Sequence, residues 1–531
     1  MATMLDRSRA FHPKLATTTA SNYHGRMASG RSAESAGATG TLPFEVVRES
    51  TAVDLRSTHT QEIVFVLCGP IGSPLHDVAA LLETLMKQEF AYECRVIRLS
   101  KLIEEHTTAV TATDTFDRVK QLIKNGNDLR QRCGASILAD LAIRQIAAER
   151  EQTKKGSAYQ SQRVCHIIDS VKNQEELDTL RVVYRDMLYC IGVFAPLGVR
   201  VQRLQAEMSL PHVYELVDQD SGEEIVHGQT VRDTFPKADF FLRSDGDKRS
   251  LQKRLERLLD LVFGTALVTP SLDETAMYHA ASASRNSACL SRQVGAAITD
   301  TSGKVLGLGW NDVPQFGGGL YREPGGMDGR CGHWQGKCHN GEEKDAITNQ
   351  IVETLLKNGL LKPDDATKAT KLVGDTSVGR LIEFSRAVHA ELHAIISAAQ
   401  SAGQQMIGGT LYCTTYPCHA CARHIVAAGL SSVRYIEPYR KSLALKLHSD
   451  SLTETEGEDS KVRILPYDGV APARYLELFD ISFGRPRKVG CDAVQRARRD
   501  AHPKCEVTLE SIPALEGLVV QRLSDRKLLA T

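Results

Sequence analysis

Three neighbouring stretches in the second half of the chain decide its fold class: FSRAVHAELHAIISAA (residues 384–399), TLYCTTYPCHACARHIVAAG (residues 410–429) and VRYIEPY (residues 433–439). The first has the apolar spacing of a helix. The second begins as a buried strand and continues, from Pro417 onward, with the pattern of another helix. A further strand follows. This alternation of helices and strands predicts an α/β domain.

The same stretches contain the residue types that bind catalytic zinc. Cys418 and Cys421, three positions apart, lie on one face of the predicted helix, whose positive N-terminal end stabilises thiolates. Together with His389 they leave the fourth tetrahedral position of Zn²⁺ for water. Glu391 is placed to transfer protons rather than to bind metal. H-x-E with P-C-x-x-C is the signature of zinc nucleobase deaminases, in which hydroxide attacks C4 of cytosine and the glutamate moves its proton to N3 and to the departing amine.

Other interpretations of these cysteines and histidines stay open. A closed structural zinc site or unrelated core cysteines would use the same C-x-x-C. His419, inside the C-x-x-C, is expected to point away from the metal, and His424 fits a packed or solvated helix position. An upstream Gly-rich loop holds a second group: Cys331, His333, Cys338 and His339. These could bind a structural zinc, but two adjacent ligands are awkward in a tetrahedron, so we favour a substrate-loop or partial metal role.

Moving outward from these motifs, the 531 residues predict two domains with additional segments at the ends. Residues 1–58 are rich in small and polar residues and predict a flexible arm. Residues 60–265 alternate strands such as EIVFVLCG and RVCHIIDS with helices, which predicts a parallel-sheet, P-loop kinase-like α/β domain. Residues 270–489 predict a cytidine-deaminase-like α/β/α domain, and residues 490–531 a poorly specified tail.

The first strand of the N-terminal domain is followed by GPIGSPLH, where a phosphate-binding loop belongs. The G-x-x-x-x-G-K-[ST] pattern is not met, because the second glycine and the lysine are missing. Gly69, Gly72 and Ser73 remain candidates for nucleotide binding through backbone N–H groups, and Asp169 stands where P-loop folds place a magnesium-linked acid. The segments near 200 and 230 resemble later parts of nucleoside and nucleotide kinases, with Arg200 and Arg203 as lid arginines. We favour a retired kinase fold that regulates the deaminase through a bound nucleotide or partner, with an active kinase as the alternative.

Composition limits the classes of partner. Lysine plus arginine equals aspartate plus glutamate, at 65 each, so the chain lacks the basic field of non-specific nucleic-acid binders. Aromatic residues are few, at 6%, which disfavours an extended groove for a single strand. No apolar run approaches the roughly 20 residues that span a bilayer, and the N-terminus has no apolar signal segment. We expect a cytoplasmic protein with reduced thiols that binds no membrane.

Around the zinc motif the chain resembles deoxycytidylate deaminases over about residues 270–485. The matching stretches are SRNS (284–287), RQVGA (292–296), GWN (309–311) and YDGVAP (467–472). The resemblance implies that Asn311 of the G-x-N motif binds the nucleotide sugar, and it makes Arg285 a further candidate for substrate binding. The alternative for Asn311 is a turn residue before Pro314.

The order of domains resembles that of bacterial anti-phage deoxycytidine nucleotide deaminases, which carry a degenerate P-loop domain ahead of the deaminase. This resemblance implies a free-nucleotide substrate, dCTP or dCMP, a Zn²⁺ cofactor, a homo-oligomer, and a defence role with an inhibitory small RNA as a regulator. An RNA or single-stranded DNA cytidine deaminase is the alternative. A nucleotide-sensing module whose deaminase serves regulation is a third possibility.

Overall fold

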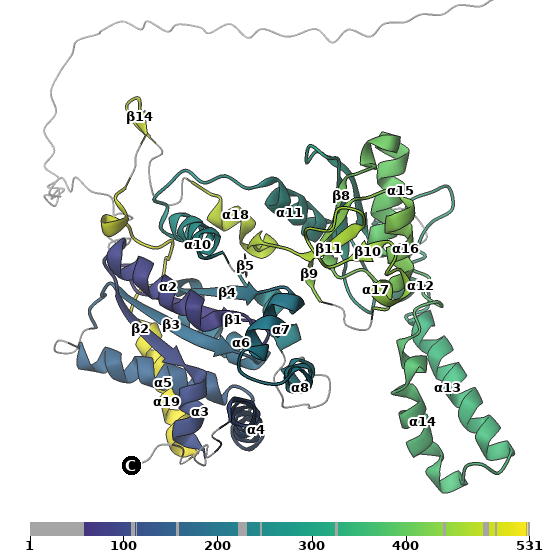
Figure 1. Cartoon of the computed structure of the whole chain (residues 1–531), viewed down its shortest axis with the longest axis horizontal. Helices are drawn as coiled ribbons and strands as arrows, with labels where there is room; N and C mark the ends of the chain where they lie inside the picture. Colours follow the sequence, from purple (N-terminus) through teal and green to yellow (C-terminus); the bar gives the residue numbers. More distant parts are fainter. Residues whose placement is uncertain are drawn as a thin grey trace, which may run out of the picture. The chain divides into compact units, whose positions relative to one another are not determined.

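The computed structural model describes residues 58–107, 112, 114–154, 159–220, 231–244, 247–323, 328–438, 442–481, 488–493, 496–526 and 528. All of them belong to one unit of the chain, Asp54–Thr531. Apart from its last residue, the predicted arm (residues 1–58) lies outside the described residues. The predicted fold class is confirmed: the chain is a mixed α/β protein built on two mostly parallel six-stranded sheets (Figure 1).

The first sheet is parallel except at one edge. Its strands, in spatial order, are β12 (Gly469–Val470), β5 (Phe240–Arg243), β4 (Leu188–Phe194), β1 (Ile63–Cys68), β3 (Val164–Val171) and β2 (Glu93–Arg98). Every residue of β1 is buried, as expected for the central strand of a parallel sheet with both faces covered. The strand β12 comes from the far end of the second half of the chain and pairs antiparallel with β5.

Helices cover both faces of this sheet. On one face, α2 (Leu75–Gln88) and α10 (Lys248–Phe263) pack on alternate residues of β1. On the other face lie α3 (Leu99–His106), α5 (Ile137–Gln152) and α6 (Gln174–Tyr184). Further helices of this half are α4 (Thr115–Cys133), α7 (Leu197–Gln205), α8 (Leu210–Asp220) and α9 (Val231–Thr234).

The C-terminal segment differs from the prediction. Residues 490–531 were expected to form a poorly specified tail, yet they contain α19 (Ile512–Asp525), which packs on α5 and α6. Its Glu516 accepts a hydrogen bond from Arg150 Nε at 2.9 Å, and the same guanidinium also pairs with Glu62, just ahead of β1. All three side chains are buried. The end of the chain is therefore an integral part of the first sheet's helical layer.

The second sheet carries the zinc motif. Its order is β10 (Leu452–Thr453), β11 (Val462–Pro466), β9 (Ser432–Glu437), β8 (Thr410–Thr415), β6 (Gly295–Thr299) and β7 (Val305–Trp310). The strand β6 pairs antiparallel with both of its neighbours, β7 and β8, and the remaining neighbours are parallel. On one face lie α15 (Ala390–Ala402) and α16 (His419–Ala427), and on the other lies α11 (Leu272–Ser284). This arrangement is the predicted α/β/α layering.

Additional helices surround this layer: α12 (Cys331–Trp334), α13 (His339–Lys357), α14 (Ala366–Gly374), α17 (Ala444–Leu447) and α18 (Tyr475–Leu478). The helices α13 and α14 lie side by side (Figure 1), where the sequence predicts a polar helical insertion. Ala280 of α11 and Ala297 of β6 belong to the same buried apolar cluster as Val64 and Ile168 of the first sheet. The two sheets therefore share a hydrophobic core. None of the helices in the described ranges is both long and apolar enough to cross a membrane.

Candidate active site

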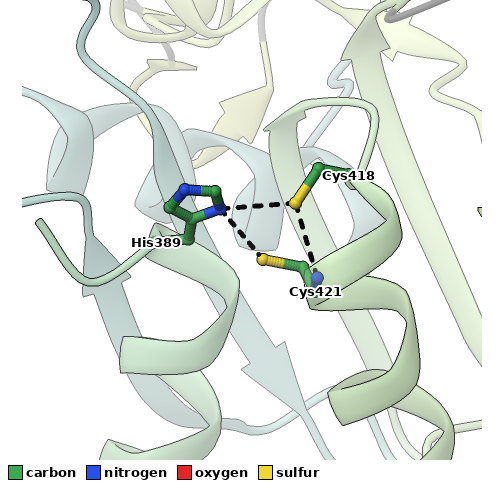
Figure 2. A group of neighbouring side chains, drawn as sticks. All are labelled: His389, Cys418 and Cys421. Carbon is green, nitrogen blue, oxygen red and sulfur yellow. Dashed lines mark hydrogen bonds between the residues drawn. The ribbon is translucent and has the colours of Figure 1, made fainter. Parts of the chain in front are cut away.

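The candidate metal ligands come from the starts of two helices. His389 is the N-cap residue of α15, and Cys418 is the N-cap residue of α16, with its Sγ accepting a hydrogen bond from the backbone N–H of Cys421 at 3.4 Å. Figure 2 shows the imidazole of His389 facing both sulfur atoms. Its Nδ1 lies 3.4 Å from Cys418 Sγ and 3.3 Å from Cys421 Sγ. The predicted ligand set is therefore brought together at one point.

The donor set fits Zn²⁺. Tetrahedral coordination with typical zinc–nitrogen and zinc–sulfur bonds places a ligand nitrogen about 3.5 Å from a ligand sulfur, which agrees with the distances from Nδ1. All three ligand atoms lie within 4.8 Å of one another. Hydrogen bonds from Cys421 and from His389 lower the pKa of the Cys418 thiol well below its usual range, which favours the thiolate that binds metal.

Glu391 lies in the first turn of α15, beside His389 and Cys418. Its side chain is buried, and this burial raises the pKa of its carboxyl group, while the neighbouring imidazole acts in the opposite direction. Burial therefore favours the protonated form of this carboxyl group. The geometry is that of a general acid and base next to a three-residue metal site.

The close packing of α15 depends on glycine. A Cβ atom at Gly309 would lie 2.2 Å from Ala390 O and 2.3 Å from Ala394 N, and one at Gly307 would meet the backbone of Ala398 at 2.6 Å. Only glycine lets β7 approach the helix that carries His389 and Glu391. Gly309 of the G-x-N motif is therefore required for the packing of β7 against α15, whether or not it contacts substrate.

Asn311 and Asp312 fasten the loop that follows α11. The Asn311 side chain accepts a hydrogen bond from Val294 N at 2.7 Å and donates one to Arg292 O at 2.9 Å. The buried Asp312 accepts from Ala288 N at 2.9 Å, and its backbone oxygen accepts from Val388 N, next to the metal-binding histidine. Asn311 therefore shapes the wall of the site and also lines it.

A cavity of about 260 Å³ opens above the metal ligands. His389, Glu391 and Cys418 form part of its lining, together with Asn311. Arg386 and Arg292 also line it, and both are exposed. Sequence reasoning missed Arg386 as a candidate, although it stands three residues before the metal-binding histidine. The cavity can accept a single small ligand with a polar or anionic end.

Arg285 lies outside the lining of this cavity. It is exposed at the C-terminal end of α11, where its Nη1 donates to Gln293 Oε1 at 3.2 Å, and it is not among the residues that line the cavity. The motif in which it stands positions the loop through Ser287, whose hydroxyl donates to Asn311 O at 2.6 Å.

The second group of cysteines and histidines does not form a metal-binding cluster among the described residues. Cys331, Cys338 and His339 line the cavity, whereas His333 is exposed. In the part of the chain that the structure describes, the only group with metal-binding geometry is His389, Cys418 and Cys421. His419 and His424 do not belong to it.

In the first domain, the predicted phosphate loop is held by the protein's own side chains. Ile71 N donates to the buried carboxylate of Asp220 at 2.6 Å, and Lys172 Nζ donates to the same carboxylate at 2.8 Å and to Gly69 O at 2.9 Å. A carboxylate therefore occupies part of the place in which the sequence suggests a phosphate.

The other loop residues have structural contacts of their own. Gly72 has a φ of +81°, and a Cβ there would lie 2.9 Å from the Cβ of Arg200. The Ser73 hydroxyl is buried without a hydrogen-bond partner among the described residues. Asp169 is fully buried and lies 2.5 Å from His76 Nδ1, and this hydrogen bond raises the pKa of His76. Arg203 is paired with Asp77 on the surface.

The fold and the cluster define a class: an α/β protein with three residues that fit Zn²⁺ and an adjacent carboxylate, the arrangement found in zinc nucleobase deaminases. Residues 270–437 match the family model described as the cytidine and deoxycytidylate deaminase zinc-binding region. The matched region contains the candidate metal ligands His389 and Cys418 together with Cys421.

Individual relatives give the extent of the similarity. Deoxycytidylate deaminase of Enterobacteria phage T4 is 28% identical over 169 residues, which are 30% of this chain and 74% of the phage protein. The dCMP deaminase of cyanophage S-TIM5, solved in complex with dCMP and dUMP, covers 38% of this chain and 99% of its own, with 21% identity and a TM-score of 0.22. Shikimate kinase from Acinetobacter baumannii covers 41% of this chain and 99% of its own, with 13% identity and a TM-score of 0.21.

Proposed function

We propose that the chain catalyses the zinc-dependent hydrolytic deamination of free deoxycytidine nucleotides, converting dCMP, dCTP or both to the corresponding uracil nucleotides. The observation that carries this proposal is the position of Glu391, buried beside His389, Cys418 and Cys421 at the base of one cavity. The family match of residues 270–437 supports the reaction class. The name of the phage T4 relative, a deoxycytidylate deaminase, supports the choice of substrate.

His389, Cys418 and Cys421 would hold the metal. Bound Zn²⁺ would supply the Lewis acidity that makes water nucleophilic near neutral pH. Glu391 accepts the proton of the attacking water and delivers it to N3 of cytosine as the new C–O bond forms at C4. The same carboxylate then assists transfer of a proton to the amino group, which leaves as ammonia when the C4–N bond breaks. The raised pKa of Glu391 suits a group that must carry and release a proton in each cycle.

The cavity admits a single small ligand, since its volume of about 260 Å³ lies just below the usual range for small-molecule sites. A deaminase that acts on strands also takes one extruded base into such a pocket, so charge rather than volume separates the two substrate classes. Strand binders need a long cationic groove with stacking platforms, and the equal number of acidic and basic residues provides no general basic field. This contrast sets the free-nucleotide deaminase above the RNA or single-stranded DNA deaminase.

We assign the phosphate end of the substrate to Arg386, because it is an exposed guanidinium at the lining of the cavity with no ion pair among the described residues. Arg292 is less available, since its Nη2 is 2.9 Å from Glu437. Arg386→Ala should raise KM for dCMP roughly tenfold or more while kcat changes little, as expected for a lost charge-assisted hydrogen bond. Asn311 remains our candidate for the sugar, whereas Arg285, outside the cavity, would act on substrate only through another residue.

The substrate test compares four compounds in parallel. Purified full-length protein is incubated with dCMP, dCTP, CTP and a cytosine-containing single-stranded oligonucleotide, and released ammonia is measured. We expect ammonia from dCMP or dCTP and none from the oligonucleotide. Deamination of the oligonucleotide with none of the free nucleotides would establish the alternative instead.

The biological setting follows from the resemblance noted in the sequence. Deamination of free nucleotides would deplete dCTP and dCMP, which fits a defence role during phage infection, with a small RNA as the inhibitor. We also propose a homo-oligomer. Light scattering on active protein tests it, and a deaminating monomer would remove that part of the proposal.

A further inference from the structure

Two buried polar atoms in the wall of the deaminase cavity have no hydrogen-bond partner among the described residues. They belong to His339 and Asn340, the first two residues of α13, and both residues line this cavity. The atoms are Nε2 of His339 and Oδ1 of Asn340. Buried polar atoms in native proteins normally have partners, so these two atoms indicate a ligand that completes their hydrogen bonds.

The contacts of the two side chains show which kind of partner is missing. Asn340 Nδ2 donates to Leu381 O at 3.0 Å, and this hydrogen bond leaves the amide oxygen as the unpartnered atom. Glu342 Oε2 lies 3.4 Å from Nδ1 of His339, and a carboxylate beside Nδ1 favours the tautomer with its hydrogen on that nitrogen. In that tautomer Nε2 carries a lone pair. Both atoms are therefore acceptors, and the missing partner is a hydrogen-bond donor.

A deoxycytidine nucleotide offers few donors. Its 4-amino group belongs at the metal site, because the proposed reaction breaks the C4–N bond beside Glu391. The ionised phosphate offers acceptors, and Arg386 in the same lining suits it. The donor that remains is the 3′-hydroxyl of the sugar. Its chemistry fits the two unpartnered acceptors.

The start of α13 is held beside the segment that leads to the metal ligands. Asn340 is tied to Leu381, and Lys344 Nζ, one turn further along α13, donates to Gly379 O at 3.1 Å. The same segment continues to Arg386 and then to His389. Because the two acceptors, the candidate phosphate contact and this metal ligand all line one cavity, a single nucleotide can contact them together.

Asn311 has fewer free hydrogen-bonding positions for the sugar than Asn340. Its amide oxygen already accepts from Val294 N, and its amide nitrogen already donates to Arg292 O. His339 and Asn340 lie outside the four stretches of sequence that match deoxycytidylate deaminases. They are therefore contacts in addition to Asn311, and their unpartnered atoms are the reason to single them out.

We propose that Asn340, with His339, binds the 3′-hydroxyl of the substrate and thereby selects free nucleotides over polymers, an inference that rests on the function proposed above. In an internal nucleotide of a strand the 3′ oxygen is esterified and has no hydrogen to donate. Both acceptors would then stay buried without a partner. A site built to hydrogen-bond a hydroxyl group strongly rejects an analogue that lacks it. Asn340 is therefore a specificity-determining residue that acts on the sugar and takes no part in proton transfer.

The test compares dCMP with 2′,3′-dideoxycytidine monophosphate, which lacks the 3′-hydroxyl, by kcat/KM on full-length, zinc-loaded protein. The parent should prefer dCMP roughly tenfold or more. Asn340→Ala should lower kcat/KM for dCMP by a similar factor and leave that for the dideoxy analogue nearly unchanged, so that the preference disappears. His339→Phe keeps an aromatic ring but removes the acceptor, and it should reduce the preference in part. Asn349→Ala, at an exposed position of the same helix, is the matched control and should keep the preference of the parent.

A preference of the parent below about threefold, or a preference that survives in both variants, would overturn the proposal. Equal losses for the two nucleotides in Asn340→Ala, with a lower Tm, would show a structural role instead. A His339→Phe protein that binds one zinc fewer than the parent would show that Nε2 holds metal, and would overturn the assignment of His339.

Binding of the product separates this proposal from the proposed function. If the protein deaminates neither dCMP nor dCTP, the proposed function fails, and isothermal titration calorimetry with dUMP and 2′,3′-dideoxyuridine monophosphate still tests the hydroxyl contact. Binding of the dideoxy compound that is about tenfold weaker in the parent, with no such difference in Asn340→Ala, would support the contact. Equal binding of the two compounds by the parent would overturn it.

Discussion

Replacing Glu391 with glutamine tests the proposed division of labour between metal binding and proton transfer. Glutamine has nearly the same shape but cannot take a proton from water. The side chain is 5% exposed, so solvent cannot easily replace it. General acid–base catalysis contributes about 10²- to 10⁴-fold, and here one carboxylate serves two proton transfers, so we expect kcat to fall by roughly 10⁴-fold, or about 5.5 kcal/mol in the barrier.

The fold and the metal should survive this change. Glutamine has nearly the same volume as glutamate and brings no charge into this buried position, so we expect little loss of stability. Zinc content, measured by elemental analysis, should match that of the parent, and the melting temperature should not fall. Glu353→Gln, on an exposed position of α13, is the control and should leave both kcat and zinc unchanged.

Two results would refute the reasoning. A kcat within about tenfold of the parent would show that another group moves the proton. Loss of zinc together with activity in the glutamine variant would place Glu391 among the metal ligands. Either outcome would require a different assignment of the residues in this cavity.

Three further changes have expected outcomes. Cys418→Ala and Cys421→Ala should lose zinc and activity together, and full activity with substoichiometric metal would rule out the zinc assignment. Arg150→Ala leaves the buried carboxylates of Glu62 and Glu516 without their partner. The free energy of unfolding, measured by urea denaturation, should fall by about 3–5 kcal/mol. A loss below about 1 kcal/mol would contradict a structural role for the C-terminal helix. Burial lowers the pKa of the His166 imidazole to about 3 in the folded protein, whereas the pKa in the unfolded chain is 6.5. The free energy of unfolding should therefore fall by about 2 kcal/mol as the pH is lowered from 6.5 to about 5, because the unfolded chain takes up the proton first. A His166→Leu variant with the same pH profile of stability as the parent would contradict this.

The metal centre could be predicted from sequence because each part of it is local. H-x-E places His389 at a helix start with Glu391 in the first turn, and C-x-x-C does the same for its two sulfur ligands. Helix geometry then fixes the directions of these side chains. Only the approach of the two helix N-termini to each other depends on the tertiary fold. The strand β8, which lies between α15 and α16 in the sequence, makes this approach the expected arrangement.

Features that depend on distant partners could not be predicted. Nothing near the phosphate loop indicates that Asp220, 149 residues from Ile71, binds its amide. The ion pair that anchors α19 joins residues 366 positions apart. The apolar pattern in IPALEGLVVQRLSD predicts a helix, but nothing near it in the sequence indicates the layer on which it packs. Arg285 stands in a matching motif, yet a motif does not determine which side of a helix end faces the cavity.

The central claim is that this zinc site converts free deoxycytidine nucleotides to uracil nucleotides by hydrolysis. The most direct measurement is mass spectrometry of the products when zinc-loaded protein reacts with dCMP and dCTP in ¹⁸O-labelled water. We expect dUMP or dUTP with a single labelled oxygen on the base and an equal amount of ammonia. Protein that carries stoichiometric zinc and converts neither nucleotide, or a product without the label, would contradict it.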